Sequence, residues 1–341
     1  MKRSKRVTLR DVAKETGVSA KTVSNVVNNT GNVSAPVRQE ILEAIERLGY
    51  QPNLAARHLR KGSSRMIALI VPTLREPYFA ELASVFVTKA QDFDVTVLIT
   101  ETDGDREREK LAIEGHNLPG IDAVVCSPLS LQESDLDSRL SKIPVVLLGE
   151  YAESFAGDAF DFQIGFDNVE AAKVATNHLL NNGARHIAVI GHQTDKSQAT
   201  SSLRFEGYKT ALESAGVAFD EKLVGTVTDF NRRESAQALQ RIIDNHVEFD
   251  GIFCFSDTMA LGTIAVLASN DSTRNRTIPI VGFDNIEEAK FAHPPFDTID
   301  PHMEQIAQVV LERLFSADRS DGYPKGDHVK TDFTLISRSI S

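Results

Sequence analysis

The sequence comprises 341 residues, of which 41% are hydrophobic and 25% are charged. This composition is typical of a water-soluble globular protein, and the length predicts two or three domains. No uninterrupted apolar run approaches the roughly 20 residues that cross a bilayer, which excludes a transmembrane helix. The basic start of the chain leads into a charged amphipathic segment instead of the apolar run of a secretory signal, so we expect a cytoplasmic protein.

The net charge of −11 is divided unevenly along the chain. Residues 1–63 contain twelve Lys/Arg and five Asp/Glu, a net +7, which leaves −18 for the remainder. This division indicates that the N-terminal piece approaches a polyanion while the acidic body is repelled from it.

The two cysteines, Cys126 and Cys254, lie in short apolar runs, which predicts buried, reduced thiols in strands. The nine histidines show none of the usual ligand spacings. We therefore expect neither a metal nor a cofactor.

The first 50 residues predict three short helices, over 9–16, 19–28 and 35–48, with Ser19 and Ser34 as N-caps. Apolar residues recur at helical spacing and predict one small core, made of Val12, Ala13, Val23, Val26, Val37, Ile41, Ile45 and Leu48. The segment 52–62 is compatible with two further helical turns, which should be marginal alone because so short a helix does not repay its nucleation.

From residue 66 short apolar runs alternate with amphipathic stretches, which predicts right-handed βαβ crossovers and parallel sheets. The expected helices lie near 78–91, 105–116 and 133–140. The rhythm then restarts, with helices expected at 168–182 and near 203–214, 232–244 and 257–268. Two successive sets of alternating units predict two doubly wound lobes with a cleft between them.

The second predicted helix offers polar side chains on one face. Ala20, Lys21, Ser24, Asn25 and Asn28 fall within about 140° of one another at 100° per residue. Lysine can donate to guanine, asparagine can bond adenine in a bidentate way and alanine can touch a thymine methyl group, as major-groove reading requires. A small three-helix domain with a merely solvated polar face is the alternative interpretation.

The hydroxyl groups of Thr8, Thr22 and Ser24 are suited to hydrogen bonds with phosphate oxygens. Such contacts would set the register of the protein on DNA without reading its sequence.

The motifs VTLRDVAKETGVSAKTVSNVVNN and VSAPVRQEILEAIERLGYQPNLAARHLRKGSS resemble the lactose-repressor (LacI/GalR) family of bacterial transcription regulators. The resemblance continues through VPTLREPYFAEL, VVCSP, SSLRFEGYKTAL, FSDTMALG and VGFDN. It implies an all-α helix-turn-helix DNA-binding domain followed by a two-lobed α/β, periplasmic-binding-protein-like effector domain with doubly wound parallel sheets.

The expected boundaries follow from this resemblance and from the rhythm of the elements. They are 1–50 for the DNA-binding domain, 51–64 for the hinge helix and linker, 65–167 and 299–324 for the N-terminal lobe, and 168–298 and 325–341 for the C-terminal lobe.

In the family, the hinge helix enters the minor groove of the operator and a leucine wedges into the central base step. The matching residue here is Leu59, and the alternative for it is ordinary packing against the effector domain. Ala55 and Ala56 are small enough to let two such helices approach each other in a homodimer on a palindromic operator. Many members place Arg where this chain has Asn25, so no operator sequence is transferred from another member.

The resemblance also implies a ligand site between the lobes, whose matching residues are Tyr78, Ser127, Gln198, Thr200, Arg204, Phe230, Ser256 and Asp284. An arginine fork and a carboxylate grip hydroxyl pairs or a charged head group, and a phenylalanine can stack on a sugar ring or a base. A sugar effector is favoured, with a purine nucleobase or a protein partner left open.

Several of these residues also have a purely structural interpretation. Arg204 and Asp284 could form ion pairs between the lobes, and Ser127 or Ser256 could cap helices. Asp257 is expected to cap the helix that follows it.

Two other functions compete with a DNA-binding regulator. An enzyme is disfavoured because GxxxxGK[ST], GxGxxG and GxSxG motifs are missing. A transport-associated binding protein would share the two lobes but would need a signal peptide and would have no use for the basic N-terminal domain. The sequence therefore predicts a transcription regulator, with repressor the expected sign by family habit, and leaves open whether the effector releases or promotes DNA binding.

Overall fold

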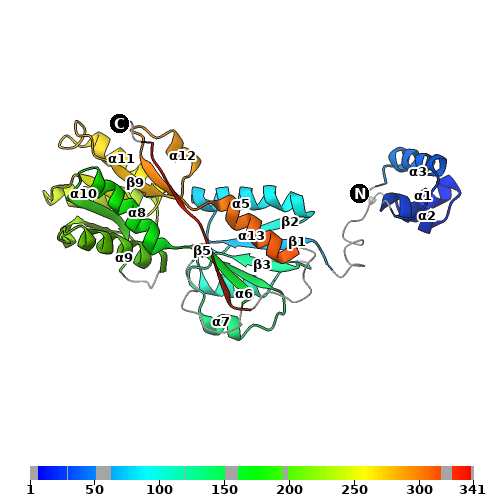
Figure 1. Cartoon of the computed structure of the whole chain (residues 1–341). Helices are drawn as coiled ribbons and strands as arrows, with labels where there is room; N and C mark the ends of the chain where they lie inside the picture. Colours follow the sequence, from blue (N-terminus) through cyan, green and yellow to red (C-terminus); the bar gives the residue numbers. More distant parts are fainter. Residues whose placement is uncertain are drawn as a thin grey trace, which may run out of the picture. The chain divides into compact units, whose positions relative to one another are not determined.

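The computed structural model describes residues 7–28, 30–50, 63–118, 120–149, 160–194, 199–315 and 325–338. The chain forms two compact units, residues 1–64 and 65–341 (Figure 1). Within these described ranges no helix is long and apolar enough to cross a membrane. The predicted hinge residues Ala55, Ala56 and Leu59 lie outside the described residues.

The described residues of the first unit form three helices, as the sequence predicts: α1 (Leu9–Thr16), α2 (Ala20–Val27) and α3 (Ala35–Leu48). The turn between α1 and α2 contains Gly17 at φ 66°, a left-handed conformation that glycine adopts without steric cost. The predicted apolar residues form the core of the unit together with Ala44 and Tyr50. The remaining, polar face of α2 points away from this core.

The first lobe of the second unit has a six-stranded, all-parallel sheet. Its strands in spatial order are β11 (Asp327–Thr331), β5 (Phe162–Phe166), β4 (Val145–Leu148), β3 (Ala123–Cys126), β1 (Met66–Val71) and β2 (Thr96–Glu101). Its helices are α5 (Pro77–Ala90), α6 (Arg106–Ile113), α7 (Glu133–Asp137) and α13 (Met303–Phe315), with a 3₁₀ turn at Gln91–Phe93.

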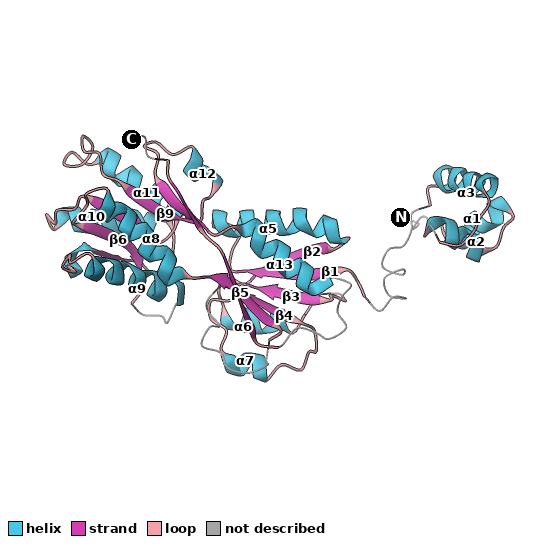
Figure 2. Ribbon diagram, viewed as in Figure 1, coloured by secondary structure: helices cyan, strands magenta, loops and turns pink. Residues whose placement is uncertain are grey.

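Alternation along β1 explains why helices cover both faces of this sheet. Ile67 and Leu69 pack in the cluster that includes α5 and α13, whereas Ala68 and Ile70 pack in the cluster that includes α6 and α7. Successive side chains of a strand point to opposite faces, so a strand that is apolar throughout is buried on both. Figure 2 shows these helices on the two sides of the sheet.

The second lobe repeats the architecture with one antiparallel edge strand, β12. Its strands in spatial order are β12 (Thr334–Ile336), β10 (Asp297–Asp300), β9 (Ile280–Phe283), β8 (Gly251–Cys254), β6 (Ile187–His192) and β7 (Val224–Thr226). Its helices are α8 (Asn168–Asn181), α9 (Ala199–Ser214), α10 (Arg232–Asp244), α11 (Asp257–Ser269) and α12 (Glu287–Lys290), with a 3₁₀ turn at Glu221–Leu223. The predicted fold class is confirmed.

The lobe boundaries differ from the expected ones near the C-terminus. The structure places β11 beside β5 in the first lobe, although the sequence assigns 325–341 to the second, and β10 extends the second lobe to Asp300 instead of ending at 298. The reason is that β11 completes the open edge of the first sheet beyond β5. The described elements therefore place crossings between the lobes after β5, after β10 and after β11.

Both cysteines are buried and unpaired, as expected. Burial raises the pKa of Cys254 to about 12 and that of Cys126 well above its usual range, which keeps both thiols protonated.

Candidate functional site

The predicted DNA-reading residues occupy the outer face of α2. Ala20 and Lys21 are exposed and Asn25 is half-buried, whereas Val23 and Val26 are buried. The Asn25 amide lies against the loop after α2, since a Cβ atom on Gly31 would come within 2.8 Å of its Nδ2. A helix that docks by its valines and turns short polar side chains outward has the geometry of a recognition helix.

The other predicted DNA contacts already take part in capping bonds. Thr8 and Asp11 form a capping box, in which the Thr8 hydroxyl donates to the Asp11 carboxylate at 2.7 Å. The Asn28 amide donates to the carbonyl and the hydroxyl oxygen of Ser24 at 2.7 and 3.1 Å, and the Thr22 and Ser19 hydroxyls are 2.9 Å apart. These residues therefore shape the ends of α1 and α2, a role that the sequence interpretation did not assign to them.

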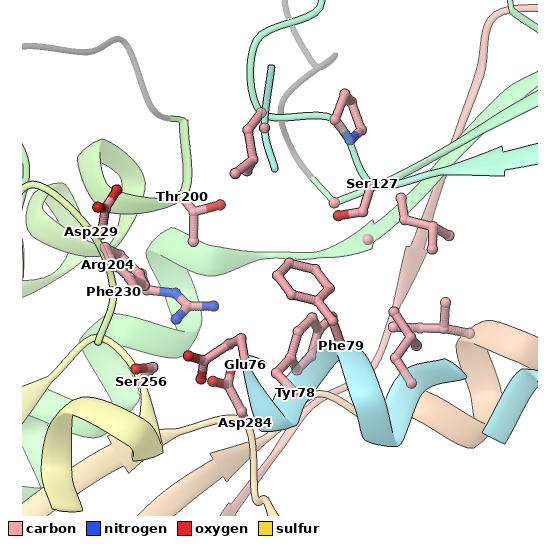
Figure 3. A pocket seen from close by; sticks show the side chains of 18 of the residues that line it. Glu76, Tyr78, Phe79, Ser127, Thr200, Arg204, Asp229, Phe230, Ser256 and Asp284 are labelled. Carbon is pink, nitrogen blue, oxygen red and sulfur yellow. The ribbon is translucent and has the colours of Figure 1, made fainter. Parts of the chain in front are cut away.

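A cavity of about 240 Å³ lies between the two lobes of the second unit. It is lined by Tyr78 and Ser127 from the first lobe and by Thr200, Arg204, Phe230, Ser256 and Asp284 from the second (Figure 3). These are the residues expected at a ligand site; the eighth, Gln198, lies outside the described residues. The cavity collects side chains that are more than 200 positions apart in the chain.

Parallel strands explain why these side chains meet. Ser127 and Asp284 directly follow β3 and β9, and Ser256 is the second residue after β8, so all three lie at the carboxyl ends of strands in the two sheets. Open α/β sheets bind ligands at this edge. The aromatic rings of Tyr78, Phe79 and Phe230 add apolar surface to the cavity.

Arg204 is held in place by the second lobe. Its Nε donates to the Asn168 side-chain oxygen at 2.7 Å, one terminal nitrogen donates to the Phe255 carbonyl, and its guanidinium carbon lies 3.5 Å from the centre of the Phe283 ring. The side chain is 5% exposed. These bonds join residues of one lobe, so the interlobe ion pair proposed as an alternative for Arg204 is not formed by them.

Asp284 carries the most perturbed carboxyl group of the cavity. Its backbone has φ 108°, a strained conformation for a residue with a side chain, and such strain clusters at functional sites. Burial raises its pKa well above the usual range, the neighbouring carboxylates of Asp257, Glu76 and Glu81 raise it further, and Arg204 opposes them.

Glu76 is a cavity residue that the sequence interpretation missed. It immediately precedes α5 in the first lobe and accepts a hydrogen bond from the Thr258 hydroxyl of the second lobe. Burial raises its pKa to about 7, against the opposing effects of this bond and of Arg232. A second link across the lobes is the bond from the Glu287 amide to Glu81 at 2.6 Å.

The structure corrects the expected cap of α11. Ser256 is the N-cap, and its hydroxyl accepts from the Met259 amide at 3.2 Å. Asp257 is instead fully buried and accepts from the Ile286 amide and the Thr298 hydroxyl. Its side chain fixes the chain that follows Asp284 because it bonds Ile286 of the loop after β9 and Thr298 of β10.

Further cavity residues escaped the sequence interpretation as well, among them Gln193 after β6 and Asp229 beside Phe230. Gln193 could have been found, because it follows an apolar strand in the same way as Ser127. Within the described ranges no group of three or more His, Cys, Asp or Glu side chains could hold a metal ion.

Comparisons with known proteins agree with this architecture. Residues 8–53 match the family described as "Bacterial regulatory proteins, lacI family", and residues 64–322 match "Periplasmic binding proteins and sugar binding domain of LacI family". The HTH-type transcriptional repressor PurR of Haemophilus influenzae is 30% identical over 319 residues, which cover 91% of this chain and 92% of the relative.

The ribose operon repressor of Halalkalibacterium halodurans is 30% identical over 307 residues, which cover 90% of this chain and 89% of the relative. A solved structure of the lac repressor dimer bound to operator and the anti-inducer ONPF matches the fold with a TM-score of 0.80 at 22% identity and covers 98% of both chains. With both units matched in order along the chain, this protein belongs to the LacI family of DNA-binding transcriptional regulators.

Proposed function

We propose that this regulator represses transcription as a homodimer on a palindromic operator, under the control of a sugar bound between its two lobes. The observation that carries the proposal is the cavity at the carboxyl ends of the strands, where groups from both lobes face the same space. A ligand that bridges two lobes binds one relative arrangement more tightly than others, and this differential affinity is what couples an effector to a distant site.

A sugar is the effector class that the lining favours. The hydroxyl, carboxyl and guanidinium groups of Ser127, Thr200, Arg204 and Asp284 suit a molecule rich in hydroxyl groups, and Phe230 offers an apolar face to its ring. The matched family description names a sugar binding domain, and one relative is a ribose operon repressor.

The effector part of the proposal is tested by thermal-shift measurements of the full chain with a panel of sugars and nucleobases. A sugar that binds is expected to raise the unfolding temperature and to change operator affinity. The Asp284→Ala variant should lose this response, whereas Glu304→Ala, an exposed carboxylate on α13, should keep it. If Asp284→Ala responds like the parent chain, Asp284 is not in the site.

The homodimer is supported by two neighbouring elements of the first lobe. Val87 on α5 and Ile99 on the edge strand β2 are large apolar side chains that are 40% and 41% exposed. Apolar groups left at such an edge mark surfaces that pair with another chain. The lac repressor, whose fold this chain shares, was solved as a dimer on its operator.

The DNA-reading assignment is tested by mobility shift on the DNA upstream of the chain's own gene. Lysine and asparagine contacts to base edges are each worth about 1–3 kcal/mol. Lys21→Ala with Asn25→Ala should therefore weaken specific binding by at least about 30-fold. Lys222→Ala with Asn245→Ala removes the same two side-chain types from the exposed surface of the second unit and should leave binding unchanged. Specific binding that survives the first pair would disprove the assignment.

A further inference from the structure

The charged groups buried in the cavity do not balance one another. Four carboxylates and one guanidinium line it among the described residues: Glu76, Asp103, Asp229, Asp284 and Arg204. Asp103 is paired with Arg108, and Asp229 is exposed. Two carboxyl groups therefore face one guanidinium in the interior, which leaves a net charge of −1 when both are ionised.

The two inner carboxyl groups come from opposite lobes and lie close enough for the Glu76 carboxylate to raise the pKa of Asp284. Figure 3 shows the Glu76 and Asp284 carboxyl groups next to each other below the Arg204 guanidinium. Asp284 is 7% exposed, and no hydrogen bond from the described part of the chain reaches its carboxyl oxygens. A buried carboxyl group that points into a cavity without a partner requires one from the ligand.

Gln193 adds a second open acceptor to the cavity. Its amide nitrogen donates to the Thr228 carbonyl, which fixes the orientation of the amide. Its oxygen is buried and has no hydrogen-bond partner among the described residues. A ligand that brings hydrogen-bond donors would satisfy these two acceptors.

We propose that the effector carries a protonated amine which lies between Glu76 and Asp284, as an amino sugar does. The proposal rests on the proposed function, since it narrows the sugar class bound at the same cavity. The ammonium group would take the place of the proton that the two carboxyl groups share and would supply three donors to carboxylates that face it from both lobes. A sugar phosphate would instead place its negative charge beside two carboxyl groups.

The burial and the neighbouring charges of Glu76 and Asp284 predict that an entering amine displaces a proton from this pair. Arg232 and Glu288 act on Glu76, and Arg204, Asp257, Glu81 and Glu76 act on Asp284. Burial raises the pKa of Glu76 to about 7 and that of Asp284 well above its usual range. The empty pair therefore holds a proton near neutral pH, and an entering ammonium group releases it to the buffer.

Isothermal titration of the full chain with matched sugars tests the proposal. The probes are glucosamine, galactosamine and mannosamine, each compared with its neutral parent hexose and its N-acetyl derivative, which keeps the nitrogen but not the charge. At about pH 6.5, below the usual pKa of an amine, we expect one amino sugar to bind at least about tenfold more tightly than both neutral partners. Buffers of different ionisation enthalpy should report a proton released on binding.

The variant Glu76→Gln should abolish the preference for the amine over its neutral partners and the proton release, because the amide keeps the shape of the carboxyl group without its charge. Glu304→Gln, outside the cavity, should keep both. If a neutral hexose binds as tightly as its amine without proton release, the amine is wrong and the sugar effector stands. If neither amino sugars nor neutral sugars bind, the proposal fails together with the sugar effector.

Discussion

Two aspartates that lie close together in space show that the same kind of side chain can either stabilise the fold or face a ligand cavity. Asp257 is fully buried and both of its oxygens accept hydrogen bonds, from the Ile286 amide at 3.0 Å and from the Thr298 hydroxyl at 2.6 Å. Asp284 lies close to it but receives no such bond from the described residues. The satisfied carboxyl group holds the loop in place, and the unsatisfied one is left for the cavity.

The buried Asp257 predicts a pH dependence of stability. Burial raises its pKa in the folded chain to about 7 from 3.8, so between these values the folded state holds a proton that the unfolded state has lost. The stabilisation is complete below about pH 4 and is lost as the pH rises through 7. Between these pH values Asp257 should lower the free energy of unfolding by up to about 1.4 kcal/mol for each unit of rising pH. Asp257→Asn should remove this contribution to the slope.

Urea unfolding of the second unit between about pH 5 and 8 measures this slope. Asp244→Asn, an exposed carboxylate on α10, serves as the control and should leave the slope unchanged. An unchanged slope in Asp257→Asn would mean that the buried carboxyl group is ionised throughout this range.

Among the elements, the helix pair α10 and α11 packs closely enough to require a glycine. A Cβ atom on Gly262 would lie 2.2 Å from the Ser235 hydroxyl and 2.3 Å from the Arg232 carbonyl oxygen. The backbone oxygen cannot move aside without shifting α10. This contact fixes the start of α11, which carries Ser256 and Asp257 next to the cavity.

Gly262→Ala should therefore force the two helices apart. We expect a loss of about 1–3 kcal/mol in the free energy of unfolding, the usual cost of overpacking. Ala265→Ser changes an exposed position of the same helix and should cost far less. Comparable denaturation midpoints for the two variants would contradict the predicted clash.

The elements with a strong local pattern were predictable from sequence, and the others depend on tertiary structure. The apolar runs over β1, β3, β4, β6, β8 and β9 and the periodic helices between them were found. β11 was missed because its sequence DHVKT alternates polar and apolar residues, and an edge strand with one exposed side has no continuous apolar run. Asp327 of β11 pairs with Phe162 of β5, and these residues are 165 positions apart (327 − 162), a distance that no local pattern reports.

The same limit explains the site. Ser127, Ser256 and Asp284 follow apolar strands, so the rule that parallel sheets bind ligands at their carboxyl ends brings them together. Glu76 precedes a proline at the start of a helix, where a carboxylate is ordinarily solvated. It is half-buried here, and Thr258 of the other lobe donates a hydrogen bond to it.

At the scale of the whole molecule, the exposed apolar residues of the first lobe predict how two chains associate. In a two-fold interface the same patch meets itself, so a charge placed there meets a like charge. Val87→Asp with Ile99→Asp should convert the proposed dimer to a monomer and lower operator affinity. Light scattering after size-exclusion chromatography reports the mass.

Leu111→Asp is the matched control for this dimer test. Leu111 is 51% exposed on α6, which packs on the opposite face of the first sheet from α5. It should leave the mass and the operator affinity unchanged. A dimer that persists in Val87→Asp with Ile99→Asp would place the interface elsewhere.

Because the chain crosses between the lobes more than once, the first lobe cannot be completed during translation until the body of the second has been synthesised. When a ribosome has finished β5, the first lobe still lacks α13, which covers one face of its core, and β11, which closes the edge of its sheet. The entire α/β body of the second lobe is synthesised before either arrives. A nascent chain therefore carries an open strand edge and uncovered apolar surface while the second lobe is synthesised, features that expose it to aggregation and make it a client for chaperones.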